Sequence, residues 1–315
     1  DGVYEEQFII GDVLGNSFTN TLTIQGESGD SSLATLQYST SASVVDYTCK
    51  FENVKGLTIR DLGIRRQDND ATSRVIEFID CDTVLLTSCY LYGYRYSQSS
   101  WDSKHASQSS LTTTYNLYVE SCQGFEMSNC YLQGPGIQMN NNYLGTYQAA
   151  DESELRILNN IGLTVVYLQD NYMQRYTLDL LVKNNVFDSL YAYYQIRIMN
   201  NNSYYSSNKS SRIIIDGNRF SSKYIFSYAP INLSKRLEYN YNYNNAFVES
   251  NDLWVFKNNY VKRHSPTNLP LTEFTNIDTV MNNIFSSENS TVVSMLTNQN
   301  PSINPSPTHF VNNYI

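Results

Sequence analysis

The chain has 315 residues and a formal net charge of −9, with 41% hydrophobic and only 16% charged residues. This length allows one large domain or two ordinary ones, and it is ample for a sizeable core. The acidic balance argues against a nucleic-acid partner, whose phosphates need a basic surface, and no apolar run approaches the roughly 18 residues of a membrane span.

A short pattern with an apolar pair, a polar or cysteine position and a further apolar residue recurs along the chain. The period-2 apolar pairs are typical of β-strands. The copies, in chain order, are Leu57-Ile59-Leu62-Ile64, Val84-Leu86-Cys89-Leu91, Phe125-Met127-Cys130-Leu132, Leu155-Ile157-Asn160, Leu180-Val182-Asn185-Phe187, Ile213-Ile215-Asn218-Phe220, Trp254-Phe256-Asn259-Val261, Val280-Asn283-Phe285 and Phe310-Asn313-Ile315.

A second short strand precedes each copy, as in Ile76-Phe78-Cys81 and Leu117-Val119-Cys122. Two strands with a sharp corner after each, followed by a return of variable length, make one turn of a parallel β-solenoid. The sequence therefore predicts an all-β fold, a right-handed parallel β-helix of about ten turns that forms a single domain over 1–315. A β-sandwich or a propeller also contains short alternating strands, but neither needs the same residue type in one position of every repeat.

The repeated polar position predicts a ladder at one corner of the solenoid. An inward asparagine there can bond to the backbone of neighbouring turns, which satisfies amides that the bend would otherwise bury unpaired. We expect cysteine to occupy the same position in earlier turns as a small buried residue. The predicted ladder consists of Cys89, Cys130, Asn160, Asn185, Asn218, Asn259, Asn283 and Asn313.

The five cysteines all lie in the first 130 residues, and their odd number excludes a complete disulfide framework. Cys81 and Cys122 share one position in successive turns, as do Cys89 and Cys130. Their Cα spacing of about 4.8 Å would allow a disulfide. Stacked inward side chains run parallel, however, and that favours reduced, buried thiols.

The N-terminal part of the chain carries a resemblance to a known group. Residues 20–32, the segment ATLQYS and the segment CKFENVKGLTIRDLGIRR resemble the first turns of secreted right-handed parallel β-helix proteins of Bacteroidota. These proteins are similar to pectate lyases in fold and often carry a type IX secretion tail. The resemblance implies an extracellular or cell-surface location, but no reaction. The missing sorting tail and the uncapped terminal strands lead us to expect a fragment, with further domains or neighbouring subunits at its ends.

An outward column of the preceding strands is the candidate ligand site. We expect it to be exposed, because outward residues of neighbouring turns would line one groove. Tyrosine rings could stack on sugar rings there while amide and guanidinium groups bond to the hydroxyls, although any polar solenoid face shows such a mixture. The candidate glycan-binding residues are Glu77, Tyr118, Gln138, Tyr167 and Arg197.

The outward column of the following strands is less polar. Its apolar members predict either a cover by the long returns or a protein contact. The column consists of Thr58, Leu85, Glu126, Arg156, Leu181, Ile214 and Val255.

Catalytic and metal-binding motifs are weak. None of the motifs of polygalacturonases or pectate lyases is present, and the three histidines are well separated. Asp68-Asn69-Asp70 begins like a calcium loop but lacks the following glycine, so we read it as a polar turn. The sequence favours a non-enzymatic surface protein for adhesion, glycan binding or surface assembly, without a metal or cofactor. The alternative is a polysaccharide lyase that uses the face from Glu77 to Arg197.

Overall fold

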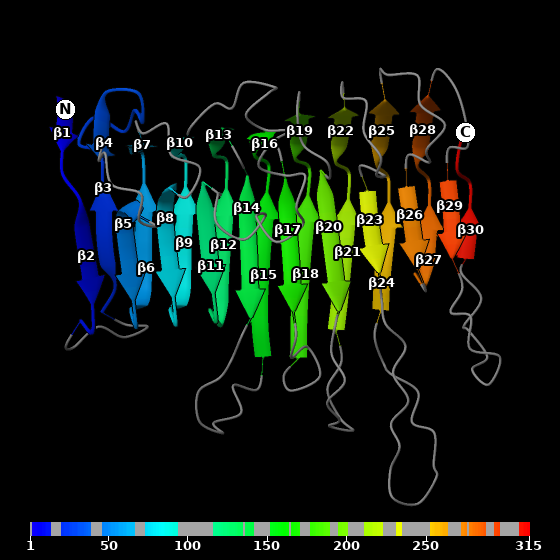
Figure 1. Ribbon diagram of the computed structural model, residues 1–315, viewed down its shortest axis with the longest axis horizontal. Coiled ribbons are helices and arrows are strands. Elements are labelled where there is room, and N and C mark those ends of the chain that lie inside the picture. Colours follow the sequence, from blue (N-terminus) through cyan, green and yellow to red (C-terminus); the bar gives the residue numbers. More distant parts are fainter. Residues whose placement is uncertain are drawn as a thin grey trace, which may run out of the picture. The chain divides into compact units, whose positions relative to one another are not determined.

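The computed structural model describes residues 2–13, 20–38, 46–66, 73–93, 116–134, 136–141, 152–163, 165–170, 177–189, 195–200, 211–222, 231–234, 253–263, 272–275, 277–287, 293–296 and 309–315. These residues form strands that belong to three parallel sheets, A, B and C, which the chain visits in turn (Figure 1). The fold is the predicted right-handed parallel β-helix. Ten described strands belong to each sheet, in agreement with about ten turns.

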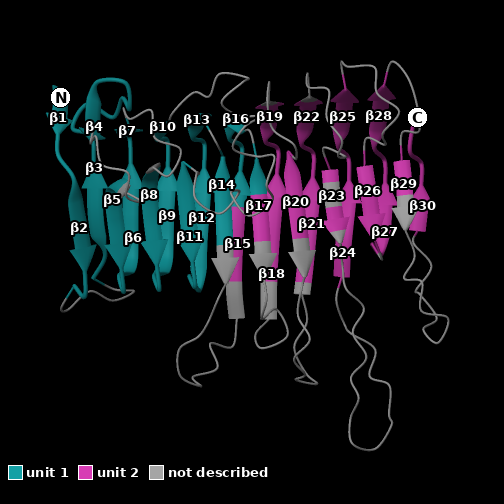
Figure 2. Cartoon of the chain, viewed as in Figure 1, with its two compact units in different colours: residues 1–140, 157–166 teal, residues 141–156, 167–315 magenta. Residues whose placement is uncertain are grey.

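The chain divides into two compact units (Figure 2). Unit 1 comprises residues 1–140 and 157–166, and unit 2 comprises residues 141–156 and 167–315. Each unit contains strands of all three sheets and a core of its own. The single domain over 1–315 stays a prediction.

In unit 1 the strands pair in parallel within each sheet. Sheet A contains β1 (Gly2–Glu5), β4 (Ala34–Tyr38), β7 (Gly63–Arg66), β10 (Tyr90–Tyr92), β13 (Tyr131–Gln133) and β16 (Ile161–Leu163); sheet B contains β2 (Phe8–Gly11), β5 (Asp46–Glu52), β8 (Ser73–Ile79), β11 (Leu117–Glu120) and β14 (Ile137–Asn141); and sheet C contains β3 (Leu22–Gln25), β6 (Lys55–Arg60), β9 (Asp82–Thr87) and β12 (Gly124–Ser128).

Unit 2 repeats this arrangement. Strand β15 (Glu152–Leu158) of sheet C contributes residues to both units, and so do β14, whose Asn141 belongs to unit 2, and β17 (Val166–Asp170), whose Val166 belongs to unit 1. Sheet A contains β19 (Val186–Ser189), β22 (Arg219–Ser222), β25 (Tyr260–Arg263) and β28 (Ile284–Ser287); sheet B contains β17 (Val166–Asp170), β20 (Ile196–Asn200), β23 (Ile231–Ser234), β26 (Thr272–Thr275) and β29 (Val293–Leu296); and sheet C contains β18 (Thr177–Lys183), β21 (Ser211–Asp216), β24 (Leu253–Lys257), β27 (Thr279–Met281) and β30 (His309–Val311).

Each turn therefore has three strands, where the repeat pattern predicted two strands and a return. The additional strands are those of sheet A, and they follow the ladder corner directly. Most of them have only three or four residues, which leaves a single inward apolar residue, such as Leu91 or Leu132, or one apolar residue followed by a buried arginine, as with Val261 and Arg263. A single apolar residue cannot show the alternation by which a strand is recognised, so the repeat pattern did not identify these strands.

Inward side chains of neighbouring turns stack on one another to form the core of each unit. In unit 1 the rings of Phe51 and Phe78 lie 5.3 Å apart, and in unit 2 those of Phe187 and Phe220 lie 4.5 Å apart. All four side chains are completely buried. Like residues stack because parallel pairing in register places the same position of each turn about 4.8 Å apart.

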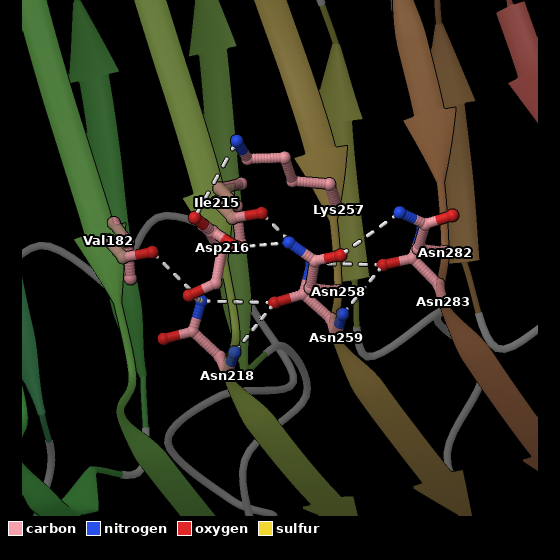
Figure 3. Close-up of polar contacts among 9 residues, drawn as sticks. All are labelled: Val182, Ile215, Asp216, Asn218, Lys257, Asn258, Asn259, Asn282 and Asn283. Atoms are coloured by element: carbon pink, nitrogen blue, oxygen red, sulfur yellow. Dashed lines mark hydrogen bonds and ion pairs between the residues drawn. The ribbon is translucent and has the colours of Figure 1, made fainter.

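The predicted asparagine ladder is present in unit 2 (Figure 3). Asn218 donates its backbone N–H and its Nδ2 to Oδ1 of Asn259, at 2.9 and 3.1 Å. The same Nδ2 also donates to the carbonyl of Val182 in the preceding turn, at 2.9 Å. Asn259 repeats this pattern toward Asn283 and Ile215. Asn185 and Asn313 extend the ladder at its two ends.

Cysteine takes the same role in unit 1. Asn160 accepts from the backbone N–H of Cys130 at 2.8 Å and donates to the carbonyl of Met127 at 3.1 Å. One turn earlier, Sγ of Cys130 accepts from the N–H of Cys89 at 3.4 Å and donates to the carbonyl of Leu86 at 3.6 Å. The cysteine sulfur therefore occupies the place of the asparagine amide in the same pattern. All five cysteines are buried and free, in agreement with the predicted reduced thiols.

Candidate functional site

The predicted ligand column follows sheet B. In unit 1, parallel pairing places Glu77 opposite Tyr118 and Tyr118 opposite Gln138. Glu77 lies between Ile76 and Phe78, which are both completely buried in the core. Because successive strand residues point to opposite faces, Glu77 lies on the outer face of the sheet. The predicted alignment of this column in unit 1 is therefore confirmed.

The expected exposure of the column is wrong. The exposed fraction is 4% for Glu77, 7% for Tyr118, 2% for Gln138 and 6% for Tyr167, and only Arg197 is half-buried. These side chains point away from the core but are shielded from solvent. Their binding of a glycan stays a prediction.

Arg74, which the sequence reasoning missed, accounts for part of this shielding. Its Nη1 lies 2.7 Å from Oε1 of Glu77, and its guanidinium carbon lies 3.7 Å from the centroid of the Tyr118 ring. The hydroxyl of Tyr118 donates to Oε2 of Glu120 at 2.9 Å. Each charged group here has an intramolecular partner, as buried charges require. The arrangement stabilises the outer face of sheet B rather than presenting free charges to a ligand.

The unit 2 part of the column has a similar contact. The guanidinium of Arg197 lies 5.6 Å from the centroid of the Tyr167 ring, within the range of a cation–π interaction. Burial raises the pKa of the Tyr167 hydroxyl, and the charge of Arg197 opposes that shift. Tyr167 is therefore a neutral side chain at physiological pH, and its ring is already covered on one side.

A partly exposed tyrosine cluster lies instead on the outer face of sheet A in unit 1. Tyr131 is 41% exposed, and its ring stacks on that of Tyr90 with 4.8 Å between centroids and an interplanar angle of 15°. Tyr92 lies beside Tyr90, with 6.1 Å between ring centroids. Both of these tyrosines are half-buried. We call these three residues the tyrosine platform.

Polar side chains border the tyrosine platform. The exposed Arg65 lies opposite Tyr92 in the neighbouring strand, with its guanidinium carbon 4.6 Å from the ring centroid. Gln133 lies opposite Tyr92 on the other side and accepts from the Tyr90 hydroxyl at 3.1 Å. The platform therefore joins apolar rings to a cation and an amide on one rigid sheet face.

A glycine explains where the row of tyrosines begins. Gly63 lies opposite Tyr90, one strand earlier in sheet A. A Cβ at this position would come within 2.6 Å of the Ser31 carbonyl oxygen and 2.8 Å of Thr35 Oγ1. The turn between β3 and β4 thus packs against this position, and the outward side chains start with Tyr90.

The outward column of sheet C is half-buried. Its residues Thr58, Leu85, Glu126, Arg156, Leu181, Ile214 and Val255 are all intermediate in exposure. The part of the column from Leu181 to Val255 is aliphatic and lies in unit 2. It forms a narrow apolar row on a sheet face that still reaches solvent.

Metal ligands do not gather in the part of the chain that the structure describes, where no group of three or more His, Cys, Asp or Glu residues could hold an ion. Asp68, Asn69 and Asp70 lie outside the described residues. Among the described residues, no helix has the length and hydrophobicity that a membrane span requires.

The comparisons with known proteins do not assign the chain to a family. No family model and no curated protein matches the chain. Among solved structures, the chain is similar to the Streptococcus pneumoniae surface protein and adhesin PfbA, with a TM-score of 0.41 and 13% identity over 99% of this chain and 90% of that chain. A likeness of this size shows nothing about a ligand of this chain.

Proposed function

We propose that this protein is an extracellular adhesion protein that binds glycans with the tyrosine platform. The observation that carries the proposal is the stack of Tyr90 and Tyr131, with Tyr131 open to solvent on a paired strand. Tyrosine provides a large apolar contact together with a polar tip, and it loses little conformational entropy on binding. Arg65 and Gln133 add hydrogen-bond donors and acceptors for hydroxyl groups.

The geometry of the strands supports a linear ligand. Strands β7, β10, β13 and β16 are successive neighbours in sheet A, and neighbouring strands lie about 4.8 Å apart. The outer face therefore offers roughly 14 Å of continuous sheet along the column. Several sugar units of one chain can contact such a surface at the same time. Only 16% of the residues are charged, and residues 20–66 resemble exported β-helix proteins. Both features support an extracellular location.

A glycan array tests this proposal. We expect the wild-type chain to bind a subset of extended glycans, and the double variant Tyr90→Ala/Tyr131→Ala to bind them at least tenfold more weakly, which corresponds to about 1.4 kcal/mol. Tyr260→Ala is the matched control, because Tyr260 is a half-buried tyrosine on sheet A in unit 2. Equal binding by the double variant and the wild type would exclude the platform as the site.

The lyase alternative needs a separate readout. Bound glycans should be incubated with the protein and followed by the ultraviolet absorbance of unsaturated sugar ends, which elimination creates. We expect no increase with time. A steady increase that Glu77→Gln abolishes would favour the lyase and the face of sheet B.

A further inference from the structure

The outer face of sheet C in unit 2 carries an aliphatic row between two rows that are charged except at Leu253. The three strands involved are in direct register: Asp179, Leu181 and Lys183 of β18 lie opposite Arg212, Ile214 and Asp216 of β21, which lie opposite Leu253, Val255 and Lys257 of β24. Inward residues such as Leu180 and Ile213 alternate with these positions and are buried. We call these nine outward residues the sheet C grid.

The middle row of the sheet C grid is apolar and only half covered. Leu181, Ile214 and Val255 are intermediate in exposure, and Leu253 beside them is 44% exposed. Aliphatic side chains in three successive turns make a continuous strip, and its exposure to water is energetically unfavourable. A strip with a polar rim is typical of a protein contact.

The charged rows are arranged in alternation. At the start of the strands Asp179 forms an ion pair with Arg212. At their end Asp216 lies 3.7 Å from Lys257 and opposite the exposed Lys183. In β18 the order along the strand is acid, aliphatic, base, and in β21 it is base, aliphatic, acid.

This order makes the face complementary to itself. Consider a second copy rotated by 180° about an axis along the aliphatic row, so that the two faces meet with their strands antiparallel. The start of β18 then meets the end of the same strand in the other copy, which places Asp179 against Lys183. In β21 the same rotation places Arg212 against Asp216. The aliphatic residues of the row meet their own counterparts.

We propose that the sheet C grid is a two-fold interface with a second copy of this chain. An isologous contact requires one patch that complements itself, and the opposite charge order of β18 and β21 fulfils this condition. Sheets pack face to face at about 10 Å, a separation that acidic and lysine side chains can span. In the third strand Leu253 meets Lys257, whose aliphatic stem can cover it while the ammonium group remains in water.

Charge reversal tests the interface. Sedimentation velocity over a concentration series should show a monomer–dimer equilibrium for the wild-type chain. Lys183→Asp places two acidic residues opposite each other, and Asp179→Lys places two lysines opposite each other. Each variant alone should dimerise at least tenfold more weakly. The control Lys262→Asp reverses a lysine on sheet A of the same unit and should leave the dimer unchanged.

Mixing the two variants gives the decisive result. In a heterodimer of Lys183→Asp with Asp179→Lys, both positions again have opposite charges, so a 1:1 mixture should recover the affinity of the wild type. A wild-type chain that stays monomeric, single variants that dimerise like the wild type, or a mixture without recovery would each overturn the proposal. The residues of the tyrosine platform lie outside this face, so a loss of glycan binding in Tyr90→Ala/Tyr131→Ala and a loss of dimerisation in the charge variants are separate outcomes.

Discussion

Paired residues at the ladder corner have different roles. In Asn258-Asn259 and Asn282-Asn283 the first residue has a φ of 55°, and the second belongs to the ladder. Asparagine tolerates this left-handed conformation better than most residues. Gly217 takes the same position before Asn218, with a φ of 66°. The corner therefore needs one residue for the bend and another for the bonds.

Replacement of Asn218 by leucine should destabilise the protein by about 1–3 kcal/mol, because the N–H of Asn185 and the carbonyl of Val182 lose buried partners. The matched variant is Asn258→Gly, at a position where φ favours glycine and the side chain bonds at the surface. We expect it to leave the free energy of unfolding nearly unchanged. Urea unfolding of both variants measures the difference, and equal losses would contradict the separate roles.

Cys130 should be replaceable by asparagine. Asn160 and Cys130 make the same pair of contacts in successive turns, so Cys130→Asn should retain the stability of the wild type. Cys130→Ala removes both contacts and should cost about 1–3 kcal/mol. The unfolding midpoint in urea under reducing conditions checks this. If the alanine variant is as stable as the asparagine variant, the thiol does not act as a ladder residue.

Asp80 should make stability depend on pH. Burial raises the pKa of this carboxyl, and the nearby charges of Glu120 and Glu52 raise it further. The folded state therefore binds the proton more tightly than the unfolded state. The free energy of unfolding then falls as the pH rises from the pKa of the unfolded state through the pKa of the folded state. Asp80→Asn should raise the melting temperature at neutral pH, and its advantage over the wild type should shrink as the pH falls below the pKa of the carboxyl. An advantage that is constant with pH would contradict this origin.

At the level of the strands, sheets B and C could be predicted from the sequence. Their strands carry two inward apolar residues, as in Ile76-Phe78 and Val84-Leu86, and a polar or cysteine residue follows at a fixed distance. This combination specifies both the strand and the corner. The strands of sheet A carry only one large inward apolar residue after the corner, and where a second side chain is buried it is Arg66 or Arg263, so no apolar period marks them.

The tyrosine platform was missed for the same reason. In the segments Tyr90-Leu91-Tyr92 and Tyr131-Leu132-Gln133 the central leucine is buried and its neighbours point outward. Recognition of the third strand would have identified the tyrosines as surface residues. The outer column of sheet B was predicted correctly in its register within unit 1, but its exposure was wrong. Alternation indicates the face of a sheet on which a residue lies, and it gives no information on what covers that face, such as Arg74 over Tyr118.

For the molecule as a whole, the two proposed functions use different units and different sheets. The tyrosine platform belongs to sheet A of unit 1, and the sheet C grid belongs to unit 2. A dimer through unit 2 would present two platforms, and linked sites raise the avidity for a repetitive ligand above that of either site alone. Weak binding at one platform is therefore compatible with adhesion to a polymeric glycan.

We propose that glycan binding takes place on the tyrosine platform of sheet A and not on the shielded column of sheet B. The direct test is calorimetric titration of the strongest array glycan into two double variants, Tyr90→Ala/Tyr131→Ala and Tyr118→Ala/Tyr167→Ala, after circular dichroism has shown that both are folded. We predict a loss of affinity of at least tenfold, about 1.4 kcal/mol, for the first variant and no change for the second. The reverse result, with binding lost only when Tyr118 and Tyr167 are replaced, would contradict the claim and return the site to sheet B.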